Sequence, residues 1–189
     1  MRIIGIAGTN GSGKDALGEI LAKDFGWFFV SISDLLRNEA RYRGLAVERE
    51  NLRKISSEWR KKYGLGILMN KAVDEYEKQK QEYNGLVIAN LRNPGEADEI
   101  HALGGRVVWV DADPHVRYAR ALSRKRGAED SKTFEQFLQE EQDEMHNHGN
   151  DDTALNMSAV KAKADIFIAN DSSDIEVFKT DITQKLNIS

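Results

Sequence analysis

Five short apolar runs divide the chain and have the pattern of buried β-strands. They are residues 3–7, 27–32, 86–89, 107–110 and 166–169. The runs are continuous rather than alternating, and such runs are typical of strands covered on both faces of a parallel sheet. The sequence therefore predicts a five-stranded parallel sheet.

Segments with helical periodicity separate the five runs. Apolar residues three and four positions apart form one face of a helix. These stripes are Leu52, Ile55, Trp59 and Tyr63; Leu68, Ala72 and Tyr76; and Ile175, Phe178, Ile182 and Leu186. Gly64 and the Gly104-Gly105 pair are placed to end two helices. We expect each stripe to be buried.

Capping residues mark where several helices begin. Asn93 precedes Pro94 and stands three residues before Glu96, which is the pattern of a capping box with proline at the first helical position. Asp113 followed by Pro114 predicts the start of the next helix in the same way, and Thr133 with Gln136 forms a second capping-box pair. Alternating strands and helices imply right-handed crossovers and a three-layer α/β domain. Ligands in such folds bind beyond the carboxyl ends of the strands, so residues there are the candidates for function.

Composition narrows the possible functions. A chain of 189 residues that is 40% hydrophobic suits one domain with a full core. Its 27 basic and 31 acidic residues give a formal charge of −4, which argues against broad nucleic-acid binding but not against a small anionic ligand. There is no cysteine, which excludes disulfides and thiolate metal sites. We find no signal-peptide pattern and no apolar run of membrane-spanning length, and we expect a cytoplasmic protein. The sequence does not indicate an oligomeric state.

The segment that follows the first predicted strand carries the strongest chemical signal. It reads Gly8, Thr9, Asn10, Gly11, Ser12, Gly13, Lys14, Asp15 and leads into a helical pattern. Strand, glycine-rich loop and helix form a phosphate-binding P-loop, in which backbone N–H groups and the helix dipole face phosphate oxygens. Lys14 is expected to reach the outer phosphates as a point charge. The alternative is an ordinary glycine-rich turn.

Asp15 departs from the usual form of this motif. The usual residue is Ser or Thr, whose hydroxyl binds Mg²⁺. A carboxylate next to a triphosphate is repelled unless a cation lies between them, and carboxylate oxygens are good ligands for hard cations. Asp15 is therefore the predicted metal ligand.

Two other predicted strands end near residues suited to a phosphoryl acceptor. Ser33, Asp34 and Arg37 follow the second strand, and Arg37 shares a helix face with Asp34. Asp34 is expected to orient or deprotonate the attacking oxygen, and Arg37 to hold an acceptor phosphate. The alternative is that Ser33 or Asp34 only caps a helix. Arg92 follows the third strand, where it is expected to reach the transferred group unless it forms only a surface salt bridge.

An arginine-rich helix follows the fourth predicted strand. Arg117, Arg120 and Arg124 lie on one face, and Arg126 comes next. One interpretation is a mobile lid whose arginines close over the nucleotide phosphates. The other is a charged face neutralised by nearby carboxylates, which are Glu135, Glu140, Glu141, Asp143 and Glu144.

Two further groups have more than one interpretation. His146 and His148 lie close to Asp151 and Asp152, where an exposed loop is favoured over a metal site. Asn170 follows the fifth strand and either contacts an adenine edge or belongs to the cap of the last helix.

These residues together give the chain a family resemblance. Nearly the whole chain resembles the nucleoside monophosphate kinase-like branch of P-loop kinases, which includes adenylate kinase and dephospho-CoA kinase, and it most resembles a dephospho-CoA kinase-related family. The motifs that carry the resemblance are residues 8–14, 33–37, Arg92 with Pro94 and Glu96, 117–126, and 164–170. The Gly-Lys-Asp ending is also similar to phage-type deoxynucleoside monophosphate kinases and to one class of phosphomevalonate kinases.

The resemblance implies an architecture and cofactors. It implies a single domain over 1–189, strand order 2-3-1-4-5, ATP with Mg²⁺, an acceptor-binding helical insert at about 33–83 and a lid at about 115–150. Related kinases carry an aspartate at the end of strand three, where this chain has Ala89 followed by Asn90. Our hypothesis is that Asp15 supplies that carboxylate from the helix instead.

The main functional hypothesis is a kinase that transfers the γ-phosphoryl group of ATP to a small molecule. The predicted catalytic residues are Lys14, Asp34, Arg92, Arg120 and Arg124, with Arg117 and Asn170 assisting the nucleotide. Nucleoside or deoxynucleoside monophosphates are the favoured acceptors, followed by dephospho-CoA. The alternative is a nucleotide-binding regulator or assembly factor with little turnover. No nucleic-acid or membrane partner is expected.

Overall fold

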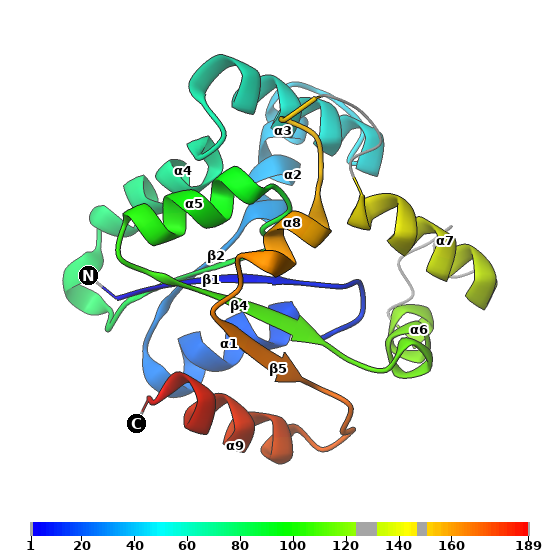
Figure 1. Cartoon of the computed structure of the whole chain (residues 1–189). Coiled ribbons are helices and arrows are strands. Elements are labelled where there is room, and N and C mark those ends of the chain that lie inside the picture. Colours follow the sequence, from blue (N-terminus) through cyan, green and yellow to red (C-terminus); the bar gives the residue numbers. More distant parts are fainter. Residues whose placement is uncertain (1, 124–131, 147–150, 189) are drawn as a thin grey trace.

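The computed structural model describes residues 2–123, 132–146 and 151–188, and its centre is a five-stranded parallel sheet (Figure 1). The strands are β1 Ile3–Gly8, β2 Phe28–Ser31, β3 Leu86–Ala89, β4 Arg106–Asp111 and β5 Ile166–Ala169. Their order is β2-β3-β1-β4-β5, and every pair is parallel. The predicted sheet and strand order are confirmed.

Helices cover both faces of this sheet. They are α1 Lys14–Phe25, α2 Ile32–Tyr42, α3 Arg49–Tyr63, α4 Ile67–Glu77, α5 Pro94–Ala102, α6 Pro114–Ser123, α7 Phe134–Met145, α8 Met157–Ala162 and α9 Ile175–Leu186, with a short 3-10 turn at Lys80–Glu82. In Figure 1, α1 and α9 lie below the sheet, whereas α4, α5 and α8 lie above it. None of the helices described is long and apolar enough to cross a membrane.

Each face of the sheet has its own hydrophobic core, because successive strand residues point to opposite sides. Ile4 and Ile6 of β1 pack with Leu17 of α1 and Phe178 of α9. On the other face, the core joins β1, β3 and β4 to helices α2–α5 and α8 and includes the buried Trp109. The continuous apolar runs therefore correctly indicate burial on both sides for β1, β3 and β4. At the edge of the sheet the expectation is wrong for β5, where Phe167 is 50% exposed.

Several predicted helix boundaries hold and others shift. Both capping boxes form, at Asn93 with Glu96 and at Thr133 with Gln136. The second strand is shorter than predicted, because Ile32 already begins α2. Ser33 and Asp34 consequently lie inside the first turn, and neither caps the helix.

Two of the residues predicted to be buried are exposed instead. Tyr63 is 55% exposed at the end of α3, where Lys62 lies over its ring. Ile175 is 48% exposed in the first turn of α9. Both are end residues of their stripes, since Tyr63 is the last residue of α3 and Ile175 is the first of α9. The inner stripe residues Ile55, Trp59 and Ile182 are buried as predicted.

The register of the sheet brings candidate residues together at its carboxyl edge. Gly8 of β1 is level with Val110 of β4, and Ser31 of β2 is level with Ala89 of β3. The glycine-rich loop therefore lies between Asp111 on one side and Asn90 on the other. Helices α2–α4 occupy the predicted acceptor insert, and α6 and α7 occupy the described part of the predicted lid.

Candidate phosphate-binding site

The glycine-rich loop has the backbone that phosphate binding needs. Gly11 and Gly13 have φ angles of 81° and 96°, in the left-handed region that favours glycine. A Cβ atom on Gly11 would lie 2.4 Å from the Arg117 carbonyl oxygen, and one on Gly13 would lie 2.3 Å from Asn170 Nδ2. Gly13 is also the N-cap of α1, and having no side chain it cannot accept a hydrogen bond from the first amides of that helix. Those amides face the mouth of the loop uncapped.

Two side chains of the loop are consistent with a bound polyanion. Lys14 is only 6% exposed, and its Nζ donates to the Thr9 carbonyl oxygen at 3.2 Å. Ser12 Oγ is fully buried and has no hydrogen-bond partner among the described residues. A buried hydroxyl without a hydrogen-bond partner is costly unless a ligand supplies one, and the uncapped helix end favours an anionic ligand. The loop therefore fits a nucleotide phosphate.

Asp15 lies beside the end of β3. Asn90 Nδ2 donates to Asp15 Oδ1 at 2.8 Å and to Ser31 Oγ at 3.3 Å. Asn90 is one of the few non-glycine residues with positive φ, at 75°, and this conformation turns its amide toward the helix. Ala89, the last residue of β3, is fully buried in the core, so it is Asn90, directly after the strand, that meets Asp15. Carboxylate, hydroxyl and amide oxygens at one edge are the donors that Mg²⁺ binds.

Asp111 is a residue of this site that we did not select from the sequence. At the end of β4, its Oδ1 accepts from Thr9 Oγ1 at 2.8 Å and from the Ala112 N–H at 2.9 Å. Burial acts to raise the pKa of Asp111, but hydrogen bonds from Thr9, Trp109 and Ala112 outweigh it, and the pKa lies below its ordinary value. An ionised Asp111 thus anchors the loop to β4. Its place directly after a predicted strand was the signal that could have identified it.

The last strand end supports the loop from the other direction. Asn170 Nδ2 donates to the Ser12 carbonyl oxygen at 2.9 Å, so this amide nitrogen is used on the loop. Arg120 donates to the carbonyl oxygens of Asn170 and Ser172, both at 2.7 Å. In this structure both side chains brace the backbone around the loop. Their predicted roles toward nucleotide stay predictions.

The predicted acceptor residues on α2 pair with each other. Arg37 Nη1 lies 2.7 Å from Asp34 Oδ1, as expected for residues that share a helix face. The Asp34 side chain is 65% exposed, and neither residue lines the two hollows described below. Ser33 is half-buried beside them. The structure brings Arg92, but not this pair, to the mouth of the loop.

Two of the arginines expected to meet phosphate, Arg92 and Arg117, are paired with glutamates of α7. Arg92 Nη1 lies 2.7 Å from Glu144, and Arg117 makes a two-pronged contact with Glu141. Arg117 is also buried and donates from Nε to the Ala112 carbonyl oxygen at 2.8 Å. For Arg117, the alternative of a face neutralised by carboxylates describes this structure. Arg124 and Arg126 lie outside the described residues.

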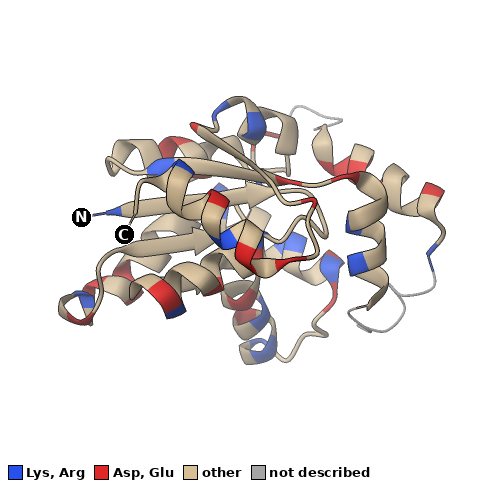
Figure 2. Ribbon diagram, turned by 90° about the horizontal axis from the view of Figure 1, so that it is seen from below, with Lys and Arg blue, Asp and Glu red and all other residues tan. Residues whose placement is uncertain are grey.

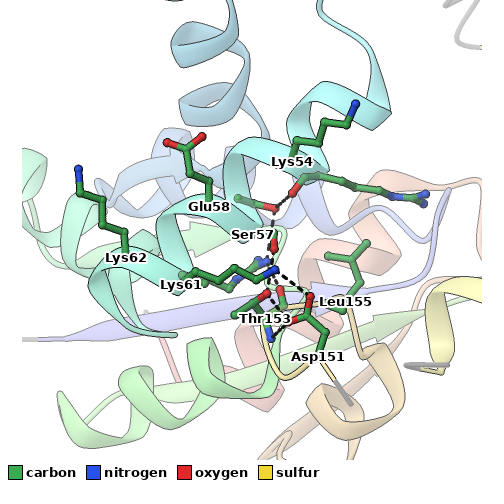
Figure 3. Close-up of a pocket in the computed structure, with 12 residues that line it drawn as sticks. Lys54, Ser57, Glu58, Lys61, Lys62, Asp151, Thr153 and Leu155 are labelled. Carbon is green, nitrogen blue, oxygen red and sulfur yellow. Dashed lines mark hydrogen bonds and ion pairs between the residues drawn. The ribbon is translucent and has the colours of Figure 1, made fainter. Parts of the chain in front are cut away.

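Two hollows lie at this end of the molecule. A small one of about 20 Å³ separates Gly8, Thr9 and Asn10 from α7. A wide one of about 750 Å³ runs along α3 and the 151–155 segment. Figure 3 shows Lys61 reaching Asp151 across the wide hollow, while Lys54, Glu58 and Lys62 point away from that segment. Arg53 lines the wide hollow and pairs with Glu144, which lines the small one, so the two hollows adjoin.

The histidine-rich segment does not form a metal site in the part of the chain that is described. No group of three or more His, Cys, Asp and Glu side chains there is arranged to hold a metal ion. His146 is the C-cap of α7, and His148 lies outside the described residues. The favoured interpretation, an exposed polar segment, agrees with the exposed Asp151 and Asp152.

Known proteins resemble this chain over most of its length. The model of a family described as an AAA domain matches residues 4–147. A UPF0200 protein of Pyrococcus abyssi is 31% identical over 185 residues, covering 95% of this chain and 92% of that protein. A UPF0200 protein of Hyperthermus butylicus is 28% identical over 186 residues, covering 98% and 93%.

Two solved kinases share the fold. The shikimate kinase of Bacteroides thetaiotaomicron has a TM-score of 0.62 at 14% identity, covering 100% of this chain and 99% of that one. The shikimate kinase of Acinetobacter baumannii, solved with shikimate, has a TM-score of 0.53 at 15% identity, covering 98% and 93%. At such identities the likeness concerns the fold and says nothing of the substrate.

Proposed function

Because this chain belongs to the AAA domain family and to the group of proteins named UPF0200, we propose that it is an ATP-dependent small-molecule kinase. The observation that carries the proposal is the loop from Gly8 to Lys14, with its buried lysine, its unsatisfied Ser12 hydroxyl and its uncapped helix. In the proposed reaction an acceptor oxygen attacks the γ-phosphorus of ATP. The bond to the β–γ bridging oxygen breaks, and ADP leaves.

The charges around the site support an acceptor that carries phosphate. Arg49, Arg53 and Arg92 converge on the region beside the loop, from α3 and from the end of β3. Guanidinium groups grip phosphate in a bidentate manner. A nucleoside or deoxynucleoside monophosphate is the proposed acceptor, with dephospho-CoA as the second choice. The wide hollow along α3 is the proposed route of entry.

A second candidate function, nucleotide binding without turnover, rests on the small space beside the loop and on Asp15. The hollow between the loop and α7 holds about 20 Å³, and Asp15 replaces the usual hydroxyl. A regulator that binds nucleotide without turnover would fit both features. The discriminating experiment measures ADP release with Mg²⁺ and a panel of ribonucleoside and deoxyribonucleoside monophosphates and dephospho-CoA. Stimulation by one acceptor supports the kinase, whereas slow hydrolysis that no acceptor changes supports the regulator.

Asp15 is the proposed Mg²⁺ ligand, and Asn90 is proposed to orient it. When bound, Mg²⁺ would neutralise charge on the phosphates. The 2.8 Å hydrogen bond from Asn90 fixes one carboxylate oxygen, which leaves the other for the ion. This arrangement supports the hypothesis that the carboxylate missing from strand three is supplied by α1.

Replacing either residue is expected to raise the Mg²⁺ concentration needed for nucleotide binding. Asn90→Gly keeps the positive φ but removes the amide, and loss of such a supporting group costs about 10–100-fold in metal affinity. Asp15→Ser is expected to cost at least as much. Calorimetry of a non-hydrolysable ATP analogue over a Mg²⁺ series measures both.

The double variant tests whether the two residues act together. Since Asn90 is proposed to act through Asp15, the Asp15→Ser/Asn90→Gly variant should bind Mg²⁺–nucleotide no worse than Asp15→Ser alone. Asp15→Ser/Asn90→Asp, which moves the carboxylate to the end of β3, should recover part of the loss. Additive effects and no recovery would contradict the link.

A further inference from the structure

We infer that α7 is a built-in competitor for the phosphate site, whose glutamates occupy the cations that a bound polyanion would otherwise use. The inference rests on the proposed function and adds a mode of regulation to the same site. The glutamates concerned are Glu140, Glu141 and Glu144. Nucleotide binding would then require α7 to be displaced.

The pairing of α7 with the site is extensive. Glu144 accepts from Arg92 at 2.7 Å and from Arg53 at 3.0 Å, so one carboxylate joins β3 to α3. Glu141 takes both terminal nitrogens of Arg117, the buried arginine whose backbone carbonyl packs on Gly11. Three guanidinium groups around the loop are thereby neutralised from a single helix.

The contacts with α3 continue this pattern. Glu140 accepts from Arg49 at 3.2 Å and from Lys132 at 2.8 Å. Arg49 and Arg53 are four residues apart on α3, and their partners Glu140 and Glu144 are four residues apart on α7, so the two pairs form successive rungs between the helices. Figure 2 shows basic positions on α6 and acidic positions on α7, adjacent at one end of the molecule. The predicted acceptor insert and the predicted lid are thus tied together by charge.

The space left at the loop is too small for a polyphosphate. The hollow between residues 8–10 and α7 is about 20 Å³, which is room for roughly one water molecule. The α7 carboxylates therefore occupy the positions that the phosphate oxygens of a bound nucleotide would need. Burial acts to raise the pKa of Glu144, but the charges of Arg92, Arg49 and Arg53 outweigh it and the pKa lies below its ordinary value. Glu144 is thus an ionised carboxylate held by three arginines, and a phosphate group could take its place.

The apolar attachment of α7 is limited, which makes displacement feasible. Among the described residues of α7, Phe137 is the buried one, and it packs against Tyr118 of α6 with ring centroids 5.6 Å apart. Phe134, which is half-buried, stacks on His115 with centroids 4.3 Å apart, so the apolar contacts of α7 are mainly with α6 and can move with it. Met145 is only partly buried against the main core.

The Arg49–Glu140 pair is half-exposed and such pairs are individually weak. Arg117 is buried, so it needs an anionic partner, and a phosphate oxygen can take the place of Glu141. A triphosphate offers the same cations several charges at once.

The test compares triphosphate affinity in charge-neutral variants of α7. In Glu140→Gln/Glu141→Gln/Glu144→Gln the helix keeps its shape but loses its hold on the cations. Calorimetry with a non-hydrolysable ATP analogue should show binding at least about tenfold tighter than in the unsubstituted protein, because more of the population is binding-competent. Asp143→Asn is the matched control: it removes one charge from the same helix, where Asp143 accepts from Gln139 at 3.0 Å, and it should leave affinity unchanged. If the triple variant does not fold, Glu144→Gln is used alone.

The outcomes separate this inference from the proposed function. Equal or weaker triphosphate binding in the variants overturns the inference and leaves the kinase proposal standing. Absence of binding by all of the variants and by the unsubstituted protein overturns the proposed function itself.

A distance measurement tests the displacement of α7 directly. Because the chain has no cysteine, Lys54→Cys with Asp143→Cys gives two spin-label sites on α3 and α7. The non-hydrolysable ATP analogue should lengthen the distance between the two labels, and an unchanged distance contradicts displacement.

Discussion

Lys14→Ala is expected to lower phosphoryl transfer by about 10³-fold or more, the magnitude that loss of a transition-state cation has in related phosphoryl-transfer sites. Lys14 is the first residue of α1, and its ammonium group is held at the loop by the Thr9 carbonyl oxygen. A triphosphate loses its nearest buried counter-charge when the lysine is removed. The measurement is ADP release with the best acceptor from the panel, together with affinity for the non-hydrolysable analogue.

A control on the same helix separates chemistry from folding. Lys23 lies in the last turn of α1 and is exposed, so Lys23→Ala should leave turnover unchanged. Lys14→Ala should keep the far-ultraviolet circular dichroism of the fold and a cooperative unfolding transition. A folded Lys14→Ala protein with undiminished turnover would show that the loop is not the phosphate site.

The elements of the fold could be predicted because they depend on local patterns. The apolar runs of all five strands and the capping box at Asn93 are readable from residues close in sequence. The strand order came from the family resemblance, since periodicity alone does not specify which strands are neighbours. Errors occurred where a pattern reached an element's end, as at Ile32, Tyr63 and Ile175.

The candidate site was predictable in part for the same reason. The loop and the helix that follows it form one local unit, so its residues were found together. The contacts of Asn90 with Asp15 and of Thr9 with Asp111 span 75 and 102 residues, and only the sheet register brings them together. Sequence reasoning identified Asp15 as unusual and, through the family resemblance, linked it to the end of strand three at Ala89 and Asn90. The hydrogen bond that Asn90 donates to Asp15 required the structure.

The charged helices show a different limit. The sequence identified both the arginines and the glutamates and left open whether they would meet phosphate or each other. The pairing of Arg117 with Glu141 required the orientation of α6 relative to α7, which no local pattern encodes. Each of these cations can exchange a carboxylate for a phosphate. Our inference about α7 therefore treats the two interpretations as two states of one site, with the arginines paired to glutamates in one and to phosphate in the other.

Arg60→Ala is expected to lower the free energy of unfolding by about 3–5 kcal/mol, because it leaves a buried carboxylate without its counter-charge. Arg60 is 3% exposed and Glu96 is fully buried, and Arg60 Nη2 lies 2.7 Å from Glu96 Oε1. Arg60 also donates to the Thr153 carbonyl oxygen at 2.9 Å, while the second Glu96 oxygen accepts from the Arg92 N–H at 2.7 Å. The pair therefore joins α3, the 151–155 segment and the end of β3.

Urea unfolding followed by tryptophan fluorescence measures this loss, and the neighbouring residue supplies the control. Lys61 forms an exposed ion pair with Asp151 at 3.2 Å, so Lys61→Ala should cost about 1 kcal/mol or less. Arg60→Met/Glu96→Leu, which replaces the pair with apolar side chains, should recover much of the stability lost in Arg60→Ala. Equal losses in Arg60→Ala and Lys61→Ala would mean that the buried pair contributes no more than a surface one. A full loss in both Arg60 variants would instead show that the hydrogen bonds to Thr153 and Arg92, rather than the paired charges, hold α3 against the site.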